Sequence, residues 1–136
     1  MPGSKLIDID LRRPDGVRAQ WDTRIAAADG TAHVVYVDAV SGQVARSRVE
    51  SDQDSGDKRE LVALLNSTKI SPQVAASTAT GRRKGTVSAI GLENSDGGPV
   101  RWSVDLMMND GGKAVLDIDS ATGSVVGEQV DLLSGR

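Results

Sequence analysis

Apolar and polar residues alternate through most of the stretch from Lys5 to Val49, and this period of two predicts β-strands with one buried face. The clearest case begins at Val17, where an apolar series that includes Trp21 is opposed by Arg and Asp side chains. The predicted strands cover residues 5–11, 17–25, 32–38 and 43–49. The predicted turns between them are Pro14-Asp15-Gly16, Asp29-Gly30 and Ser41-Gly42. Strands joined in sequence by short turns are typical of an antiparallel meander.

The first of two predicted helices begins at Asp57, after a polar linker at residues 51–56. The Asp57 carboxylate can accept backbone N–H bonds while Glu60 reaches back, as in a capping box. The helix then carries an apolar stripe of Leu61, Leu64 and Leu65. The acidity of the linker also suggests a calcium loop, but its spacing lacks the glycine and the terminal glutamate of an EF-hand. A solvated linker is therefore the favoured interpretation.

The second predicted helix begins at Ser71-Pro72, a hydroxyl N-cap followed by a proline at the first helical position. Gly81 is the expected C-cap. The side chains of this helix are small enough for close approach to a sheet; they include Val74, Ala75, Ala76 and Ala79.

The second half of the chain repeats the pattern of the first at an offset of 81 residues, which places Trp21 on Trp102. The positions that agree are turn glycines, turn aspartates and inward apolar residues, so the repeated feature is a fold unit and no set of reactive groups recurs with it. The other matches are Ile9 with Ile90, Leu11 with Leu92, Asp15-Gly16 with Asp96-Gly97, Asp29-Gly30 with Asp110-Gly111, Val34 with Val115, Asp38 with Asp119, Gly42 with Gly123 and Val44 with Val125. The corresponding strands are predicted at 86–92, 100–106, 113–119 and 124–133.

These elements predict an α+β fold of two small antiparallel meanders with one or two short helices between them that pack on the sheets. The predicted organisation is a first repeat of strands alone at 5–50, the linker at 51–56, and the helices with the second repeat at 57–136. Residues 1–4, Met-Pro-Gly-Ser, resemble a remnant of recombinant expression more than a targeting segment. We therefore expect that an upstream part of the native chain, with any signal or anchor, is missing.

Composition limits both the core and the chemistry. Aromatic residues make up 2% of the 136 residues, so Trp21 and Trp102 are the only large anchors, and replacing either with alanine is expected to cost about 3–5 kcal/mol. The net charge of −3 with scattered positive residues argues against nucleic acid as the main partner. The absence of cysteine excludes disulfides and thiolate metal sites. No apolar run is long enough to span a membrane.

The candidate reactive residues favour structural interpretations. His33 is the only histidine, and the spacing supplies no partner for a general base or a zinc site. Asp117 and Asp119 share a strand face as paired carboxylates or cation ligands would. Only Asp119 has a counterpart in the first half, Asp38, so turn chemistry is favoured, with the carboxylate accepting N–H bonds from the Thr122-Gly123 or Ser41-Gly42 backbone. We predict no catalytic, metal or cofactor site, and no enzyme activity.

Three surface features could contact a partner. Met107-Met108 could form a soft contact surface, which would involve whichever of Leu106 and Met107 faces outward. Arg82-Arg83-Lys84 could touch an acidic partner or an anionic lipid surface, although a charge run after a helix end is usually solvated and favourable to the helix dipole. The edge strands could accept an extended peptide through their unpaired backbone groups, which requires no special side chain.

The order of elements from Ile70 onward resembles the PepSY family: a short Ala-rich helix, a strand, a strand with an aromatic residue, an Asp-Gly turn, and a strand that ends in Asp-x-x-x-Gly. The last motif stands here as Ile118-Asp119-Ser120-Ala121-Thr122-Gly123-Ser124-Val125, and earlier as Val37-Asp38-Ala39-Val40-Ser41-Gly42-Gln43-Val44. The resemblance covers residues 69–130 completely, and only the strands of the first copy.

This resemblance implies a unit of one helix on a three-stranded antiparallel sheet, found in exported bacterial proteins and proposed to restrain peptidases. No catalytic residue belongs to the family pattern. Because the first copy lacks its helix, two arrangements stay open. In one arrangement, the Asp57 helix covers the first sheet and the Ser71 helix covers the second. In the other, the two sheets or two chains share cover, which gives a homodimer.

The resulting hypothesis is a non-enzymatic, extracytoplasmic binding or regulatory module with a protein partner, which the resemblance suggests is a secreted peptidase. The alternative is a structural cell-envelope domain of a larger anchored protein that binds no peptidase.

Overall fold

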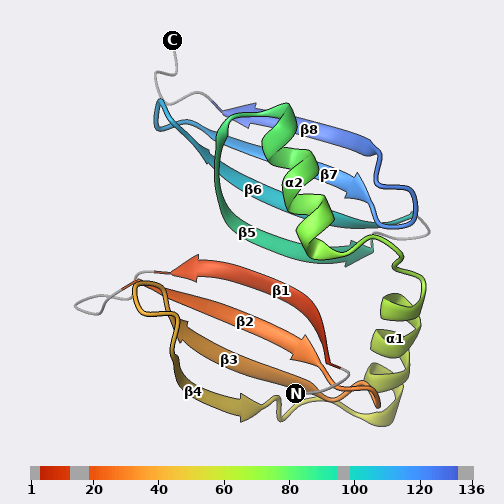
Figure 1. Cartoon of the computed structure of the whole chain (residues 1–136). Coiled ribbons are helices and arrows are strands. Elements are labelled where there is room, and N and C mark those ends of the chain that lie inside the picture. The colour runs from red at the N-terminus through yellow and green to blue at the C-terminus, as the bar shows by residue number, and fades with distance from the viewer. Residues whose placement is uncertain (1–3, 13–18, 95–98, 132–136) are drawn as a thin grey trace. The chain divides into compact units, whose positions relative to one another are not determined.

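The computed structural model describes residues 4–12, 19–94 and 99–131 and has the predicted α+β composition (Figure 1). It divides into two compact units, Met1–Asn66 and Ser67–Arg136. The first unit contains β1 (Lys5–Arg12), β2 (Gln20–Ala26), β3 (Ala32–Asp38), β4 (Val44–Val49) and α1 (Ser55–Asn66). The second contains α2 (Pro72–Arg82), β5 (Gly85–Asn94), β6 (Val100–Met108), β7 (Lys113–Asp119) and β8 (Val125–Asp131).

Several predicted features lie outside the described residues. They are the opening Met1-Pro2-Gly3, the turn Pro14-Asp15-Gly16, its counterpart Asp96-Gly97, and the end of the last predicted strand at 132–133.

Each unit holds its strands in an antiparallel meander, with the order β4-β3-β2-β1 in the first sheet and β5-β6-β7-β8 in the second. The pairing of β2 with β3 joins Trp21 to Val37, and the pairing of β6 with β7 joins Trp102 to Ile118 at the same offset of 81 residues. The irregularities correspond as well, because the register of β1 shifts between Leu6 and Asp8 and that of β5 between Val87 and Ala89. Residues that are 81 positions apart therefore occupy the same register positions.

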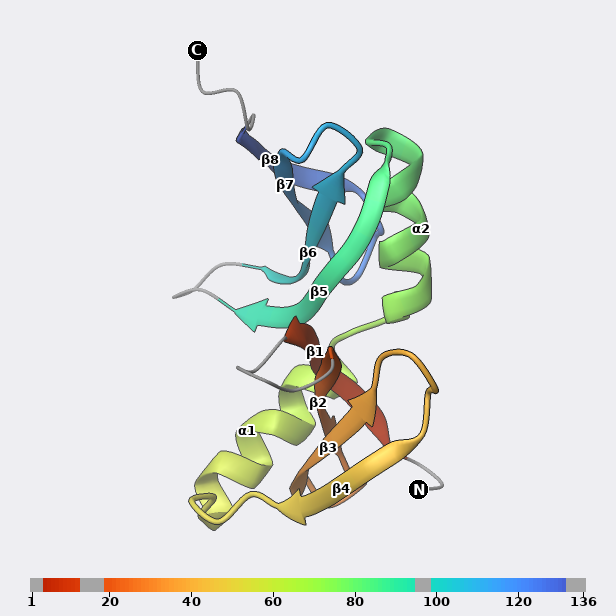
Figure 2. The ribbon, with the colours of Figure 1, turned by 90° about the vertical axis from the view of Figure 1, so that its left-hand side faces the viewer.

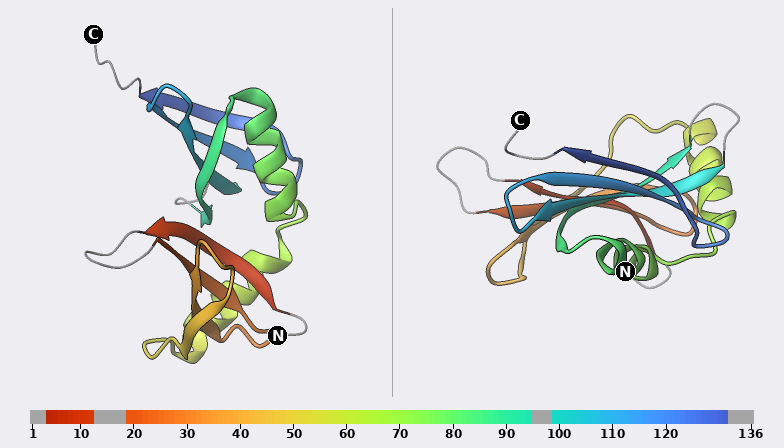
Figure 3. Two further views of the ribbon diagram at one scale, coloured as in Figure 1. Left: turned by 60° about the vertical axis from the view of Figure 1, so that its left-hand side comes forward. Right: turned by 90° about the horizontal axis from the view of Figure 1, so that it is seen from above.

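The core of the second unit lies between its sheet and α2, which packs against β5, β6 and β7 (Figure 3). Ala75 and Ala79 of α2 are fully buried, so the small side chains allow the predicted close approach. The Trp102 side chain is 1% exposed, and its indole N–H donates to the Ile70 carbonyl at 2.8 Å. The other buried residues of the sheet are Ile90, Val104, Leu106, Ala114, Leu116 and Ile118.

The start of α2 is as predicted, and its end is not. The Ser71 hydroxyl accepts the Val74 N–H at 3.2 Å, which confirms the N-cap. The predicted C-cap at Gly81 was wrong, because the helix continues to Arg82 and Arg83 is the capping residue. Arg83 is extended, and its N–H donates to the Ala79 carbonyl, so the helix ends without the left-handed glycine that the sequence suggested.

The start of α1 was predicted three residues too late. Asp54 and Asp57 form the reciprocal capping arrangement: the Asp57 N–H donates to the Asp54 carboxylate at 2.8 Å, and the Asp54 N–H donates to the Asp57 carboxylate at 3.2 Å. Asp57 is therefore the acidic residue that reaches back, and Asp54 is the capping residue. The linker shortens accordingly, because α1 already begins at Ser55.

α1 stands at the end of the first sheet, beside the β2–β3 turn (Figures 1 and 2). Gln53, just before the helix, donates to the Gly30 carbonyl and accepts the Ala32 N–H, at 2.9 and 2.7 Å. A Cβ on Gly30 would lie 2.3 Å from the Lys58 carbonyl oxygen of α1. These contacts fix α1 to the turn. Of the two arrangements that the sequence left open, the one in which the Asp57 helix covers the first sheet is therefore not the one observed.

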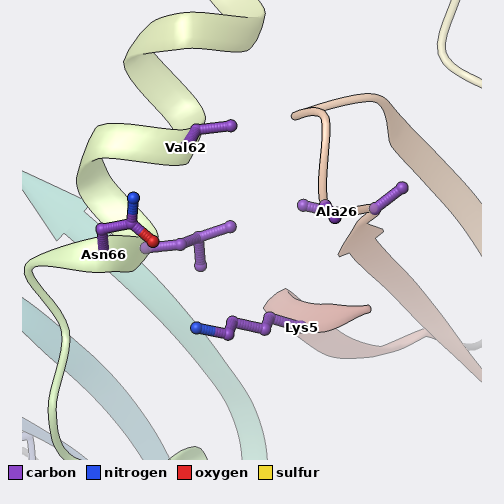
Figure 4. A pocket seen from close by; sticks show the side chains of 7 residues that line it. Lys5, Ala26, Val62 and Asn66 are labelled. Atoms are coloured by element: carbon purple, nitrogen blue, oxygen red, sulfur yellow. The ribbon is translucent and has the colours of Figure 1, made fainter. Parts of the chain in front are cut away.

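The compact units divide after Asn66, so α1 belongs to the first unit, whereas the sequence analysis grouped both helices with residues 57–136. Leu65 is the one described α1 residue that is buried, and it lies near Ala26 in a small pocket (Figure 4). The helix therefore closes one end of the first sheet.

Candidate interaction surface

One face of the first sheet carries a continuous apolar surface that no helix of its own unit covers. Alternation along the strands and the cross-strand pairs place its members on the same side. We call this the Trp21 face; its apolar members are Leu6, Ile9, Leu11, Trp21, Ile25, Val35, Val37, Val44 and Val49.

The Trp21 face is far more accessible than the corresponding face of the second sheet. Leu11, Val44 and Val49 are 40, 62 and 55% exposed, and Trp21 is only partly buried. The strongly buried residues of β2 and β3 lie on the opposite face; they are Ala26, Ala32 and Val34. In the first sheet, β2 and β3 therefore bury the face opposite Trp21, whereas in the second sheet β6 and β7 bury the face that carries Trp102.

The Trp21 face carries no Lys, Arg, Asp or Glu side chain among the described residues. Its polar members are Thr23, His33 and Ser47. The acidic and basic residues of the described β1–β4 strands lie on the opposite face, where Lys5 pairs with Ala26. The Thr23 hydroxyl oxygen is buried without a hydrogen-bond partner. Its counterpart in the second sheet is Val104, so this unpaired hydroxyl is a departure from the apolar pattern.

His33 lies at the edge of the Trp21 face, opposite Ile25 on β2 and Val49 on β4. It is partly buried, and no contact among the described residues joins it to a carboxylate. No group of three or more His, Asp or Glu side chains comes together as metal ligands would in the part of the chain that the structure describes.

The opposite face of the first sheet holds an ion-pair cluster. Arg24 lies 3.2 Å from the Asp8 carboxylate and 3.4 Å from that of Glu50. Burial raises the pKa of Asp8; Arg24 opposes this rise, while Glu50 and Asp10 add to it. Charged side chains therefore pair across this face, where the buried Arg24 Nε has an ion pair with Glu50 but no hydrogen bond.

β4 forms the outer edge of the first sheet, with β3 as its strand neighbour. All six of its residues are exposed. Arg46 and Arg48 project on the side away from the Trp21 face, and the Arg46 guanidinium lies 4.3 Å from the centre of the Tyr36 ring. Neither arginine has a carboxylate partner among the described residues. Edge strands in general were predicted from the sequence as contact surfaces, but these two residues were not. The Arg-x-Arg spacing in the last strand of the meander could have identified them.

Asp38 and Asp119 perform the predicted turn chemistry, one residue earlier than expected. The Asp38 carboxylate accepts the Val40 and Ser41 N–H groups at 2.8 and 3.0 Å. The Asp119 carboxylate accepts the Ala121 and Thr122 N–H groups at 2.8 and 3.1 Å. Gly42 and Gly123 then complete the turns with φ of 76° and 82°, which glycine adopts without strain.

The other predicted surface residues lie in different environments. Leu106 is fully buried and Met107 is 50% exposed, so Met107 is the outward residue of that pair. Arg82 and Arg83 both pair with Glu128 of β8, and their side chains stay 55 and 43% exposed, in line with the solvated interpretation. Arg83 and Arg82 hold the pKa of Glu128 below its usual range through their hydrogen bonds. Asp117 contacts Arg101 at 3.5 Å, whereas the Asp119 carboxylate accepts the turn N–H groups.

A pocket of about 150 Å³ lies beside α1, with Lys5 reaching from β1 toward Asn66 (Figure 4). Its lining is Lys5, Ala26, Ala27, Ala28, Val62, Leu65 and Asn66. The pocket brings together no pair of groups suited to acid–base or nucleophilic catalysis.

None of the helices within the described residues has the length and apolar character needed to cross a membrane.

Comparison with known proteins defines the fold more than the function. No family model matches the chain, and no curated protein matches it. A crystal structure of CD1622 from Clostridium difficile 630, provisionally named a lipoprotein, matches with a TM-score of 0.57 and 20% identity, over 95% of this chain and 84% of that chain. The YpmB protein from Bacillus subtilis matches with a TM-score of 0.43 and 16% identity, over 92% of this chain and 84% of that chain. The protein therefore shares its α+β fold with the Clostridium protein.

Proposed function

We propose that this protein is an exported, non-enzymatic module that binds another protein through its first unit, and that it is related to PepSY domains. The observation that carries the proposal is the accessible Trp21 face, which has no Lys, Arg, Asp or Glu side chain among its described residues. The second unit has the same strand register, but there the corresponding face is buried. Accessible apolar patches bordered by polar residues are typical of protein interaction sites. The corresponding face of the second unit shows that this strand pattern can be closed by a packed helix.

The proposed location outside the cytoplasm rests on two supports. One is the resemblance of the Asp38 and Asp119 turns to the PepSY motif, a family of exported proteins. The other is the fold shared with a protein provisionally named a lipoprotein. Fractionation of the native cells tests this location, and recovery of the protein from the cytoplasm alone would exclude it.

Val49 and Val126 supply a matched pair of variants for the binding test, because they are 55 and 53% exposed and lie in different units. Immobilised wild-type protein is incubated with the envelope and culture fractions of the native cells. We expect a bound protein that Val49→Glu loses and Val126→Glu retains, since a charge disrupts only the surface that is in contact. Equal capture by both variants would remove the first unit as the binding surface.

For the partner we propose a secreted peptidase, on the basis of the PepSY resemblance. A panel of secreted bacterial peptidases is assayed with increasing protein, and at least one should bind and lose activity. A panel without binding or inhibition would reject this partner while leaving the binding module itself open to the capture experiment.

The second candidate function is a structural domain of a larger envelope-anchored protein, favoured by the lipoprotein name of the structural neighbour. It predicts that deletion of the domain from the native protein changes the position of that protein in the envelope and leaves secreted peptidase activities unchanged. A homodimer is the remaining proposal for the Trp21 face, and sedimentation at increasing concentration tests it.

A further inference from the structure

The open edge of β4 presents unpaired backbone groups at known positions. The Glu50 N–H donates to the Ala32 carbonyl at 2.9 Å, which makes Ala32 and Glu50 a hydrogen-bonded pair. Hydrogen-bonded and non-bonded pairs alternate along an antiparallel ladder. Arg48 and Arg46 therefore direct their backbone groups toward β3, and Ser47 and Val49 direct theirs away from the sheet.

The side chains of β4 differ sharply between its two faces. Arg46 and Arg48 lie two residues apart on one face, without a carboxylate partner in the described part of the chain. Val44, Ser47 and Val49 lie on the other face and extend the Trp21 face to the edge. The Arg46 guanidinium stacks on the Tyr36 ring of the neighbouring β3, which keeps it on this face of the sheet.

We propose that β4 takes up an extended segment of a partner protein as a fifth strand of the first sheet, and that this segment carries carboxylates at every second position with apolar residues between them. This inference rests on the proposed binding function and specifies the chemistry of the partner. An added strand lies about 4.8 Å from β4, so its alternate side chains fall beside those of β4. The carboxylates then pair with Arg46 and Arg48, and the apolar residues widen the Trp21 face.

The outer edge of the second sheet does not offer the same site. β8 carries acidic side chains, Glu128 and Asp131, and Glu128 is already paired with Arg82 and Arg83. β8 itself carries no Lys or Arg, so an acidic segment would find no cationic side chain along this strand. The charge of the two edges therefore favours β4 as the site.

The first test measures binding of two synthetic peptides by calorimetry: one alternates glutamate with valine and threonine, and the other has lysine in place of each glutamate. The glutamate peptide should bind, and binding should slow hydrogen exchange at the Ser47 and Val49 amides. Equal binding of both peptides, or protection confined to β8, would overturn the proposal.

Ser47→Pro tests the backbone contribution, because Ser47 directs its N–H away from β3. Proline removes this donor and leaves the ladder to β3 in place, as at natural edge strands. We expect about tenfold weaker peptide binding, the loss of roughly one hydrogen bond, with an unchanged melting temperature. Ser47→Ala is the matched control and should bind as wild type does. Unchanged binding by Ser47→Pro would exclude strand addition at β4.

A charge exchange tests the side-chain contribution. The double variant Arg46→Glu and Arg48→Glu should lose the glutamate peptide and bind the lysine peptide, and added salt should weaken both pairings. Continued preference for the glutamate peptide would overturn the proposed chemistry. The two proposals can fail separately: a native partner captured equally by Ser47→Pro rejects the edge site alone, whereas peptide binding without any captured partner counts against the proposed function alone.

Discussion

Trp21 and Trp102 occupy the same register position in two sheets of the same topology, but their surroundings differ. Trp102 is 1% exposed, lies under α2, and donates its indole N–H to Ile70. Trp21 lies partly exposed on a face that α1 leaves open. The difference shows that strand pairing and helix cover are separate properties of this fold, because equal registers coexist with different cover.

The two faces also differ in the polar groups that they contain. Thr23 and His33 of the first sheet stand where the second has the fully buried Val104 and Ala114. A buried hydroxyl without a partner costs about 1–3 kcal/mol, so it would weaken a closed core. The polar residues Thr23 and His33 therefore suit a face that a partner covers better than a face closed by the chain's own helix.

The largest expected effect separates the two tryptophans. Trp102→Ala should cost about 3–5 kcal/mol of unfolding free energy, because it empties a closed core. Trp21→Ala should cost about 1–2 kcal/mol, since the partly exposed Trp21 side chain buries less apolar area against the rest of the protein. This revises the equal costs predicted from the sequence alone. Urea unfolding followed by the fluorescence of the remaining tryptophan measures each cost.

Fluorescence quenching supplies an independent control for that prediction. In the two single-tryptophan proteins, iodide should quench Trp21 and leave Trp102 largely unaffected. Equal costs together with equal quenching would break the distinction between the units.

The next effect concerns the attachment of α1. Gly30 has φ of 89°, and a side chain there would meet the Lys58 backbone of α1. Gly30→Ala should therefore cost more than Gly42→Ala, which has φ of 76° and open space around it. The control should show only the backbone strain of about 1–2 kcal/mol. Hydrogen exchange should report the additional loss as faster exchange in α1, and slow exchange in α1 would contradict its fixation to the turn.

The sequence predicted the meanders well because local patterns determine them. The strands at 32–38 and 113–119 agree with the structure at both ends, since alternation and Asp-Gly turns act over a few residues. The N-cap at Ser71 followed from one hydroxyl and one proline. The cap of α1 shifted by three residues because Asp54 and Asp57 both suit that position, and spacing alone did not choose between them.

The candidate surface was less predictable, because it depends on where a helix packs. The stripe of Leu61, Leu64 and Leu65 shows that α1 has an apolar side but does not show which part of the sheet it meets. That choice depends on Gly30 and Gln53, whose contacts span 21 residues or more. The ion pairs of Glu128 with Arg82 and Arg83 were missed for the same reason.

A reciprocal exchange at Thr23 and Val104 tests the polar difference between the two faces. Val104→Thr should destabilise the protein by about 1–3 kcal/mol, because it places an unpaired hydroxyl in a closed core. Thr23→Val should stabilise it by about 1 kcal/mol, since it removes a hydroxyl that already lacks a partner. Thermal unfolding measures both changes. A loss of stability in Thr23→Val would mean that the hydroxyl has a role that the contacts do not show.

A smaller effect is expected at the acidic edge of the second sheet. Hydrogen bonds from Arg83 and Arg82 lower the pKa of Glu128 from its ordinary value of 4.5. The associated stability is present above that ordinary value and is lost as the pH falls through the lower pKa of the folded state. Glu128→Gln should therefore lose stability relative to wild type at neutral pH, and the difference should shrink in acid. A difference that is independent of pH, in urea unfolding at several pH values, would contradict the ion pairs.

The smallest effect has the opposite sign and belongs to the first sheet. Burial raises the pKa of Asp8 above 3.8 despite the nearby Arg24, because Glu50 and Asp10 also disfavour its charge. A raised carboxyl pKa stabilises the folded state below the unfolded value, and this contribution is lost as the pH rises through the folded pKa. Asp8→Asn removes the titrating group, so its stability relative to wild type should improve from about pH 3 to about pH 7. The same urea series measures it, and a trend parallel to that of Glu128→Gln would imply that Arg24 outweighs burial at this face.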